Sequence, residues 1–248
     1  MKKNNSIKKI TLLLLIIFSQ SGYGQFWFTK EKLYGDKNVV TEIRRMSSYD
    51  KISVTGPYRV KIVSGNIHEV KVSADENLMQ AIDIFVKSGR LIIRIHPDFN
   101  IQKYTRLDIE VPADYLSDIR LTGSGEIYAT YVFDWNNLKL KITGSGDMDF
   151  ETKMKNITAS LTGSGEIKLE GKTEYLKLNL TGSGEIDAKN LKAVDADVHL
   201  TGSGDIRVKA HQHLNIKLLG TGNVYYYEEP EYLKTKSLGS GEIIFREL

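Results

Sequence analysis

A seven-residue string recurs along the chain and constrains its fold more than any other feature. It reads Leu-Thr-Gly-Ser-Gly-Glu-Ile at residues 121–127 and returns, with small changes, at six later places. Self-similarity at a fixed period of this kind is the signature of a repeat architecture. The first glycines of the copies are Gly123, Gly144, Gly163, Gly182, Gly202, Gly220 and Gly239, spaced 21, 19, 19, 20, 18 and 19 residues apart.

Apolar and polar residues alternate on both sides of each Gly-Ser-Gly. In the third copy, Ile157, Ala159 and Leu161 precede the glycines, and Ile167 and Leu169 follow them. Alternation with a period of two is typical of a strand with one buried face, and glycine permits the positive φ of a sharp bend. Each repeat is therefore predicted as a strand, a Gly-Ser-Gly corner, a second strand and a polar corner of variable length.

One coil of a β-solenoid per repeat explains why the same residues return at the same corner, because neighbouring coils must superpose. A propeller blade needs roughly 40 residues, and hairpins of an antiparallel meander would not demand identical corners. We predict an all-β fold: a single-stranded parallel β-helix, or solenoid, with coils of about 19 residues. The crossover rule predicts right-handed coiling.

Three segments precede the repeats. Residues 1–24 combine four lysines, a nine-residue apolar stretch at residues 10–18, and Gly22 and Gly24. They predict a signal peptide cleaved before Gln25, with an uncleaved anchor as the alternative. Residues 25–48 are predicted to be a linker or N-terminal arm. Residues 49–116 predict an irregular β region of early coils or a β cap, continuous with the repeat β-helix of residues 117–248 in one domain, 49–248.

Composition excludes several classes of protein. The chain has 248 residues, a formal net charge of +3 and no cysteine. Without residues 1–24 it carries 30 basic and 31 acidic side chains, which is no footprint for a nucleic acid backbone. The absence of cysteine excludes disulfides, thiolate zinc sites and a lipidated cysteine. No long uncharged apolar run follows residue 24, so we expect no transmembrane segment in the mature chain.

Three stretches together resemble a known family. They are Asp-Lys-Ile-Ser-Val-Thr-Gly-Pro-Tyr at residues 50–58, Val-Lys-Val-Ser-Ala-Asp-Glu-Asn-Leu at residues 70–78, and the repeated Thr-Gly-Ser-Gly-Glu/Asp-Ile. The family is the "putative auto-transporter adhesin, head GIN domain" family of secreted bacterial proteins, and the resemblance begins near residue 40. It implies a β-helical fold and an exported protein of the periplasm, outer-membrane surface or extracellular space. It implies no chemistry, and no functional residue is carried over from it.

An acidic residue follows each Gly-Ser-Gly and precedes an inward Ile or Met, so it points outward. Stacked coils would place these carboxylates ~5 Å apart, where like charges repel by ~1 kcal/mol in water. Solvation and neighbouring bases could relieve the repulsion, and a bridging Ca²⁺ is the alternative, since calcium takes several oxygen ligands. We expect no other metal or cofactor. The candidate calcium ligands, called the acid column below, are Glu126, Asp147, Glu166, Glu185 and Asp205.

Threonine and serine recur beside the acid column and would form a flat polar strip along one edge of the solenoid. A repetitive strip suits a repetitive ligand such as a glycan. The alternative is that small residues are simply what a tight corner accepts, with their hydroxyls bonded to backbone amides. The residues of this Thr–Ser strip are Thr122, Thr143, Thr162, Thr181, Thr201, Ser124, Ser145, Ser164, Ser183 and Ser203.

The spacing of the residues suggests no catalytic constellation, since the acids are regular rather than singular. We therefore expect a non-enzymatic, adhesin-like binding protein for an envelope or host glycan or another cell-surface ligand. One alternative is a carbohydrate-active enzyme of the polysaccharide lyase or hydrolase type on the same scaffold. Another is a structural module that forms a homo-oligomer through the solenoid ends. Trp135 lies in the longest segment between repeats, and it could stack on a sugar or pack over the coil edge.

Overall fold

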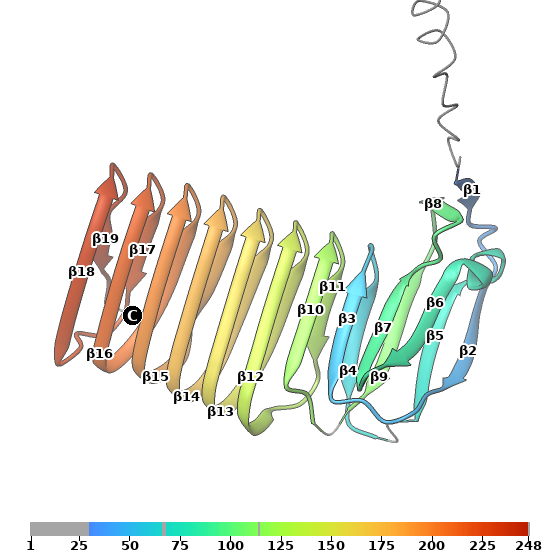
Figure 1. Cartoon of the computed structure of the whole chain (residues 1–248), viewed down its shortest axis with the longest axis horizontal. Helices are drawn as coiled ribbons and strands as arrows, with labels where there is room; N and C mark the ends of the chain where they lie inside the picture. The colour runs from blue at the N-terminus through green and yellow to red at the C-terminus, as the bar shows by residue number, and fades with distance from the viewer. Residues whose placement is uncertain (1–29, 66–67, 114, 248) are drawn as a thin grey trace, which may run out of the picture. The chain divides into compact units, whose positions relative to one another are not determined.

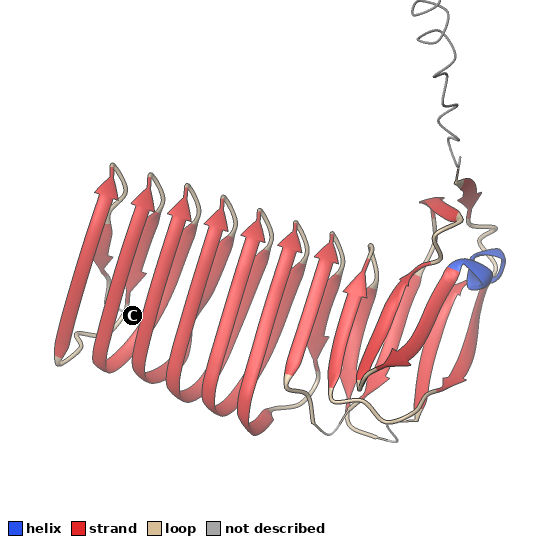
Figure 2. Cartoon of the chain, viewed as in Figure 1, coloured by secondary structure: helices blue, strands red, loops and turns tan. Residues whose placement is uncertain are grey.

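The computed structural model describes residues 30–65, 68–113 and 115–247. The chain divides into two compact units, Met1–Lys30 and Glu31–Leu248, and the fold below is that of the second. The predicted signal peptide and its alternative, an uncleaved anchor, lie outside the described residues. Almost all regular structure among the described residues is strand, with one short 3₁₀ helix, η2 (Glu76–Ala81) (Figure 2). No helix in the described part of the chain has the length and apolar character that crossing a bilayer requires.

The repeats form a stack of parallel coils, as the sequence predicts (Figure 1). The first glycine of each repeat pairs with that of the next, from Gly123 with Gly144 through to Gly220 with Gly239. This pairing of equivalent glycines in every repeat confirms the β-solenoid; its right-handed coiling stays a prediction. The strands of the stack are β10 (Asp118–Gly123), β11 (Glu126–Ala129), β12 (Phe133–Gly144), β13 (Asp147–Gly163), β14 (Glu166–Gly182), β15 (Glu185–Gly202), β16 (Asp205–Gly220), β17 (Asn223–Tyr226), β18 (Tyr232–Gly239) and β19 (Ile243–Phe245).

The second corner of the central coils differs from the expected polar loop. Strands β13, β14 and β15 run without interruption from one Gly-Ser-Gly to the next, over 17, 17 and 18 residues. The ladder continues through the bend because residues there also pair with the neighbouring coil, as Thr152 does with Gly171. Differences in coil length are absorbed by register shifts, such as the one between Ala188 and Ala193 of β15. The second corner is therefore a curved sheet surface on which side chains lie in columns.

The N-terminal β region contains both alternatives that the sequence leaves open. Strands β3 (Lys51–Thr55) and β4 (Arg59–Val63) stack in parallel on β10 and β11, so they form an early coil. Strands β7 (Arg90–Ile95) and β9 (Leu107–Pro112) stack in parallel on that coil in turn.

Antiparallel strands close this end as a cap. Strand β6 (Ile82–Lys87) pairs with β7, β5 (Glu69–Asp75) with β9, and β2 (Val39–Arg45) with β5. Strand β1 (Glu31–Tyr34) pairs in parallel with β8 (Phe99–Lys103). The described part of the expected linker, residues 25–48, thus holds two strands, β1 and β2. Most residues of these two strands are exposed, so their sequences show no clear alternation of apolar and polar residues.

Columns of apolar side chains fill the inside of the coils. Behind the Gly-Ser-Gly corners, Ile127, Met148, Ile167, Ile186, Ile206 and Val224 are at most 1% exposed. Burying an aliphatic side chain of this size contributes about 1.5–3 kcal/mol relative to leaving it exposed. The alternation of the sequence fixes which residues face inward, so the intervening polar residues are held on the outer surface at coil spacing.

Candidate functional site

The Thr–Ser strip runs along the Gly-Ser-Gly corners, which follow the arrowheads of the long strands in Figure 1. Backbone bonds hold these corners: the amides of Ser145, Ser164 and Ser183 each donate to the first glycine carbonyl of the preceding coil, at 2.9 Å. The first glycines have positive φ, +132° at Gly163, where an added Cβ would lie 2.0 Å from the oxygen of Gly144. The stacking thus requires glycine here, and it leaves the residues between and beside the glycines on the surface.

The hydroxyls of the strip face solvent. All ten predicted threonines and serines are exposed. In the described part of the chain, none of these hydroxyls bonds a backbone amide, and Ser203 accepts a hydrogen bond from the Thr221 hydroxyl at 2.9 Å. The corner is therefore satisfied by its own backbone, and the structure brings the ten predicted residues together as two columns of exposed donors and acceptors.

The acid column lies beside the strip, and four of its five carboxylates have protein partners. Glu126 lies 3.0 Å from Nε of Arg59, and Glu185 pairs with Arg207. The shorter Asp147 and Asp205 accept hydrogen bonds from backbone amides of the next coil, at 3.1 and 3.0 Å. Between these acids and the serines lies a shallow hollow of about 300 Å³.

These ion pairs and hydrogen bonds weaken the repulsion between stacked carboxylates, which is the reason for considering calcium at this column. Among the described residues, no group of three or more His, Asp or Glu side chains is placed to hold a metal ion. Each coil offers one carboxylate at this column, whereas Ca²⁺ takes six to eight oxygens. Calcium binding at the acid column stays a prediction, which the Discussion takes up.

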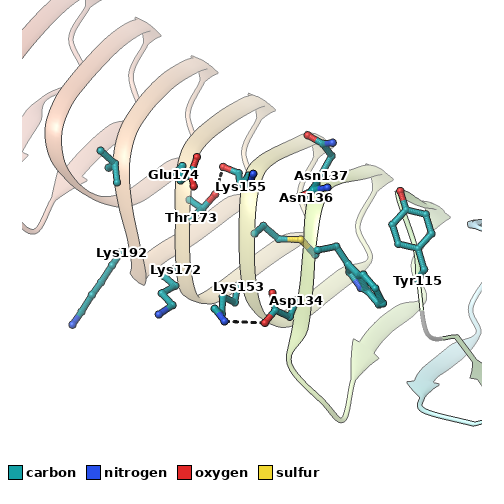
Figure 3. A pocket seen from close by; sticks show the side chains of 13 residues that line it. Tyr115, Asp134, Asn136, Asn137, Lys153, Lys155, Lys172, Thr173, Glu174 and Lys192 are labelled. Carbon is teal, nitrogen blue, oxygen red and sulfur yellow. Dashed lines mark hydrogen bonds and ion pairs between the residues drawn. The ribbon is translucent and has the colours of Figure 1, made fainter.

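A groove of about 690 Å³ lies over the second corner, across β12, β13, β14 and β15 (Figure 3). Trp135, Met154 and Thr173 stack in register and form its floor, so the floor side chains become smaller from one coil to the next. Trp135 packs against the core, and Tyr115 meets it edge to face with ring centroids 5.2 Å apart. Trp135 thus packs over the coil edge and also lines the groove, and stacking of a sugar on its ring stays a prediction.

A column of charged side chains forms one rim of this groove, which we call the lysine groove. Asp134, Lys153, Lys172 and Lys192 lie in register on four successive coils. Lys153 bonds Asp134 at 3.0 Å, whereas no ion pair of Lys172 or Lys192 occurs among the described residues. Sequence reasoning missed this column, although the three lysines are spaced 19 and 20 residues apart, with the period of the glycines.

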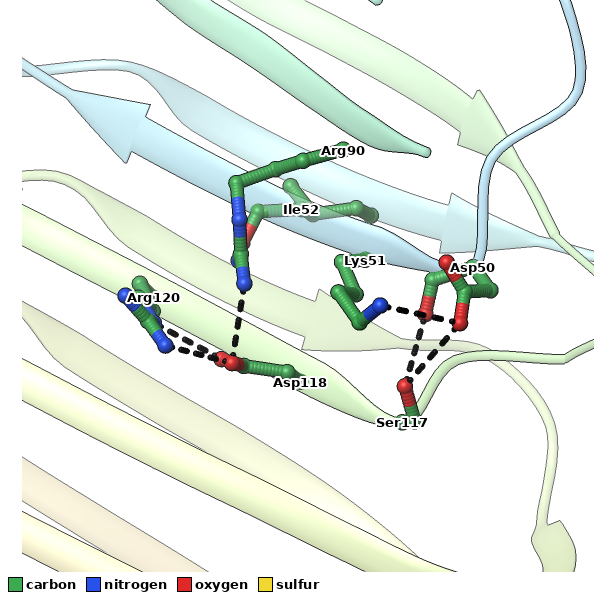
Figure 4. A network of polar contacts seen from close by, with 7 residues as sticks. All are labelled: Asp50, Lys51, Ile52, Arg90, Ser117, Asp118 and Arg120. Carbon is green, nitrogen blue, oxygen red and sulfur yellow. Dashed lines mark hydrogen bonds and ion pairs between the residues drawn. The ribbon is translucent and has the colours of Figure 1, made fainter. Parts of the chain in front are cut away.

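A separate charged cluster joins the early coils and is structural. Asp118, 8% exposed, accepts hydrogen bonds from Arg90 at 2.9 Å and from Arg120 at 2.7 and 2.9 Å (Figure 4). Burial alone would raise the pKa of Asp118, but the bonds from Arg120 and Arg90 outweigh burial and lower the pKa below its ordinary value. Arg90 also donates to the carbonyl of Ile52. The bonds of Arg90 tie β7 to β10 across β3. Both carboxylate oxygens of Asp118 already accept hydrogen bonds, so this carboxylate is not available to act on a ligand.

The family of the chain follows from a comparison with family models. The model described as "putative auto-transporter adhesin, head GIN domain" matches residues 48–230. The chain belongs to this family. The match covers the early coils and the repeats through β17, so the head GIN domain is the solenoid with most of its cap. The resemblance noted from the sequence is confirmed, and membership makes the chain an adhesin-like protein.

Solved structures share the fold. A putative adhesin from Bacteroides fragilis is 21% identical with a TM-score of 0.81, covering 86% of this chain and 100% of that one. A putative lipid binding protein from Parabacteroides distasonis is 25% identical with a TM-score of 0.73, covering 88% and 100%. A putative adhesin from Parabacteroides merdae is 19% identical with a TM-score of 0.69, covering 86% and 99%. No curated protein matches the chain. The names of the family and of these three structures refer to adhesion or binding and not to catalysis.

Proposed function

We propose that the protein is an exported, non-enzymatic binding protein that takes a linear glycan of the cell envelope or of a host along its Thr–Ser strip. The observation that carries the proposal is the pair of exposed hydroxyl columns, in register over five coils and not used by the corner itself. Membership in the head GIN domain family supports a role in adhesion. The proposed location is the periplasm, the outer-membrane surface or the extracellular space.

The strip matches a repeating ligand better than a compact one. Parallel coils stack ~4.8 Å apart, so each coil offers one threonine and one serine hydroxyl at a constant interval. A hydrogen bond exchanged with water contributes only about 0.5–1.5 kcal/mol. Useful affinity therefore needs several coils to be engaged at once, which a chain of hydroxyl-bearing sugars lying along the stack achieves.

Neither alternative role has a comparable observation behind it. A glycosidase needs an acid whose proton is poised for the leaving group and a partner carboxylate across the bond, whereas the acid column is a uniform row. For end-to-end assembly, the last coil replaces inward Ile216 and Leu218 with Thr235 and Ser237, and it carries Lys234 and Lys236 on its outer side. Lysine on an edge strand disfavours pairing with another sheet edge.

A glycan array probed with the purified protein tests the binding role. The double variant Thr162→Val/Thr181→Val keeps the shape of two central strip residues and removes their hydroxyls. Thr158→Val, on the outer face of β13 away from the strip, is the matched control. We expect the double variant to lose most of the binding to a neutral glycan found with the original protein, and the control to keep it. Equal binding by all three proteins, or no glycan bound by the original, would contradict the proposal.

Export has its own test. The chain, produced in a Gram-negative host and recovered from the periplasm or medium, should begin at Gln25. Recovery only from the cytoplasm with residues 1–24 attached would contradict export, and recovery from the inner membrane with those residues attached would favour the uncleaved anchor.

A further inference from the structure

The lysine groove has an unbalanced charge on its rim. Four lysines line it, Lys153, Lys155, Lys172 and Lys192, against the carboxylates of Asp134 and Glu174. The bond to Asp134 satisfies Lys153. Lys172 and Lys192 lie in register on neighbouring coils, so their like charges repel one another about one coil spacing apart. A ligand with negative charges at a similar interval would reverse that repulsion.

The opposite end of the groove is aromatic. Trp135 and Tyr115 meet at 87°, and Met154 continues the floor beside them. Aromatic rings and the apolar faces of sugar rings are flat and complementary, while the hydroxyls at the sugar edge reach polar groups such as Asn136 and Asn137 on the rim. The groove thus offers a stacking surface and a row of positive charges on one line along the coils.

The groove is open to solvent, and this favours a hydrated anionic polymer over an anionic lipid with an acyl chain. Of its thirteen lining residues only Trp135, Met154 and Thr173 are not exposed. An acyl chain laid there would keep much of its surface in water, whereas pockets for apolar ligands enclose most of the ligand. A hydrated polymer can keep its solvent-facing side in water while it is bound. The groove of about 690 Å³ is lined by residues of successive coils, so a linear polymer can lie along it.

We propose that the lysine groove is a second binding site, for a linear acidic glycan that carries carboxylates along its length. Tyr115, the more exposed ring of the aromatic pair, stacks against one sugar, and Lys172 and Lys192 pair with the carboxylates of the following ones. The site lies at the corner of the coils opposite the Gly-Ser-Gly corners (Figure 1). It goes beyond the proposed function, because it uses other residues and a different ligand chemistry from the Thr–Ser strip.

Calorimetric titration of the protein with polygalacturonate and with hyaluronan tests this site. The variant Lys172→Gln/Lys192→Gln removes the two unpaired charges and keeps side-chain length. The matched control, Lys141→Gln/Lys217→Gln, removes two exposed lysines outside the groove. We expect the groove variant to bind about tenfold more weakly, since two partly exposed ion pairs together amount to roughly one decade in affinity. The control should bind like the original protein.

Two further arms separate charge from stacking. Methyl-esterified polygalacturonate keeps the sugar rings and loses the carboxylates, so it should bind as weakly to the original protein as the acid form binds to the groove variant. Tyr115→Leu removes a 42% exposed ring and should weaken binding about threefold, the scale of one aromatic contact. The strip variant Thr162→Val/Thr181→Val should leave acidic-glycan binding unchanged, so the two sites are tested independently.

Several results would overturn the proposal. They are binding of neither acidic glycan, equal affinity of the groove variant and its control, and equal binding of the esterified polymer. Binding to phosphatidylglycerol vesicles that requires Lys172 and Lys192, without binding to either glycan, would assign the groove to a membrane surface instead.

Discussion

Replacing a corner glycine is the sharpest perturbation that the stacked coils suggest. At Gly163, φ is +132° and an added Cβ would lie 2.0 Å from the carbonyl oxygen of Gly144 in the coil beneath. Two separate costs are therefore expected for Gly163→Ala. A left-handed backbone costs a residue with a side chain about 1–2 kcal/mol. Forcing a methyl group into a packed backbone costs about 1–3 kcal/mol more, giving about 2–5 kcal/mol of lost stability.

The chain supplies a control for each cost. Gly65 has φ of +152°, and among the described residues the nearest atom to an added Cβ is Cβ of Pro112, 3.8 Å away, so Gly65→Ala carries the backbone cost alone. Gly165 has no positive φ, but an added Cβ would lie 2.0 Å from Gly146 O, so Gly165→Ala carries the collision alone. Each control should lose less stability than Gly163→Ala.

Urea unfolding followed by circular dichroism measures these differences, since the free energy of unfolding falls linearly with denaturant. We expect the losses of stability from Gly65→Ala and Gly165→Ala to add up roughly to the loss from Gly163→Ala. A Gly165→Ala protein as stable as the original would refute it, because the coil beneath would then not lie where the register places it.

Three further predictions concern buried carboxylates and calcium. Asp75 is fully buried, and its Oδ2 accepts the amide of Thr105 at 2.6 Å, so Asp75→Ala should cost about 1.5–3 kcal/mol in urea unfolding. Burial would raise the pKa of Asp75, but hydrogen bonding, chiefly from the Thr105 amide, lowers it overall. The pKa of Asp118 is also lowered. Both carboxylates then stabilise the fold fully above the ordinary value near 4. The stability should fall as pH drops through the lowered values, and Asp118→Asn should flatten that profile; an unchanged profile would contradict it. If the acid column binds Ca²⁺, millimolar calcium should raise the melting temperature, and Glu166→Gln/Glu185→Gln should abolish the rise; an unchanged melting temperature of the original protein would exclude calcium there.

The repeats could be read from sequence because each coil is a local unit. Strict alternation around Gly163 fixes which side chains face inward, and the near-constant period fixes which coil lies on which. The Thr–Ser strip and the acid column follow from these two facts alone, since residues at equivalent positions must stack. The 3₁₀ helix at residues 76–81 and the hairpin of β6 and β7 are likewise formed by residues close together in the sequence.

The rest depends on pairing between distant segments. Strand β2 joins the sheet through antiparallel pairing with β5, about 30 residues away, and its mostly exposed side chains leave no alternation to read. The Asp118 cluster draws Arg90 from 28 residues upstream. Tyr115 and Trp135 meet only because the chain folds back over the coil edge. The spacing of the three lysines was visible in the sequence. That they form a column could not be predicted, because it depends on strand pairing that continues through the second corner.

The central claim is that equivalent residues stack in one column, one coil per repeat. The chain has no cysteine, so cysteines introduced at two chosen positions can be spin-labelled specifically. One pair is Ser124 with Ser203, four coils apart by the register of the glycines, and the other is Ser124 with Ser240, six coils apart. At ~4.8 Å per coil, pulsed electron paramagnetic resonance should give distances centred near 19 and 29 Å. Equal distances for the two pairs, or a shorter distance for Ser240, would contradict the stacked coils.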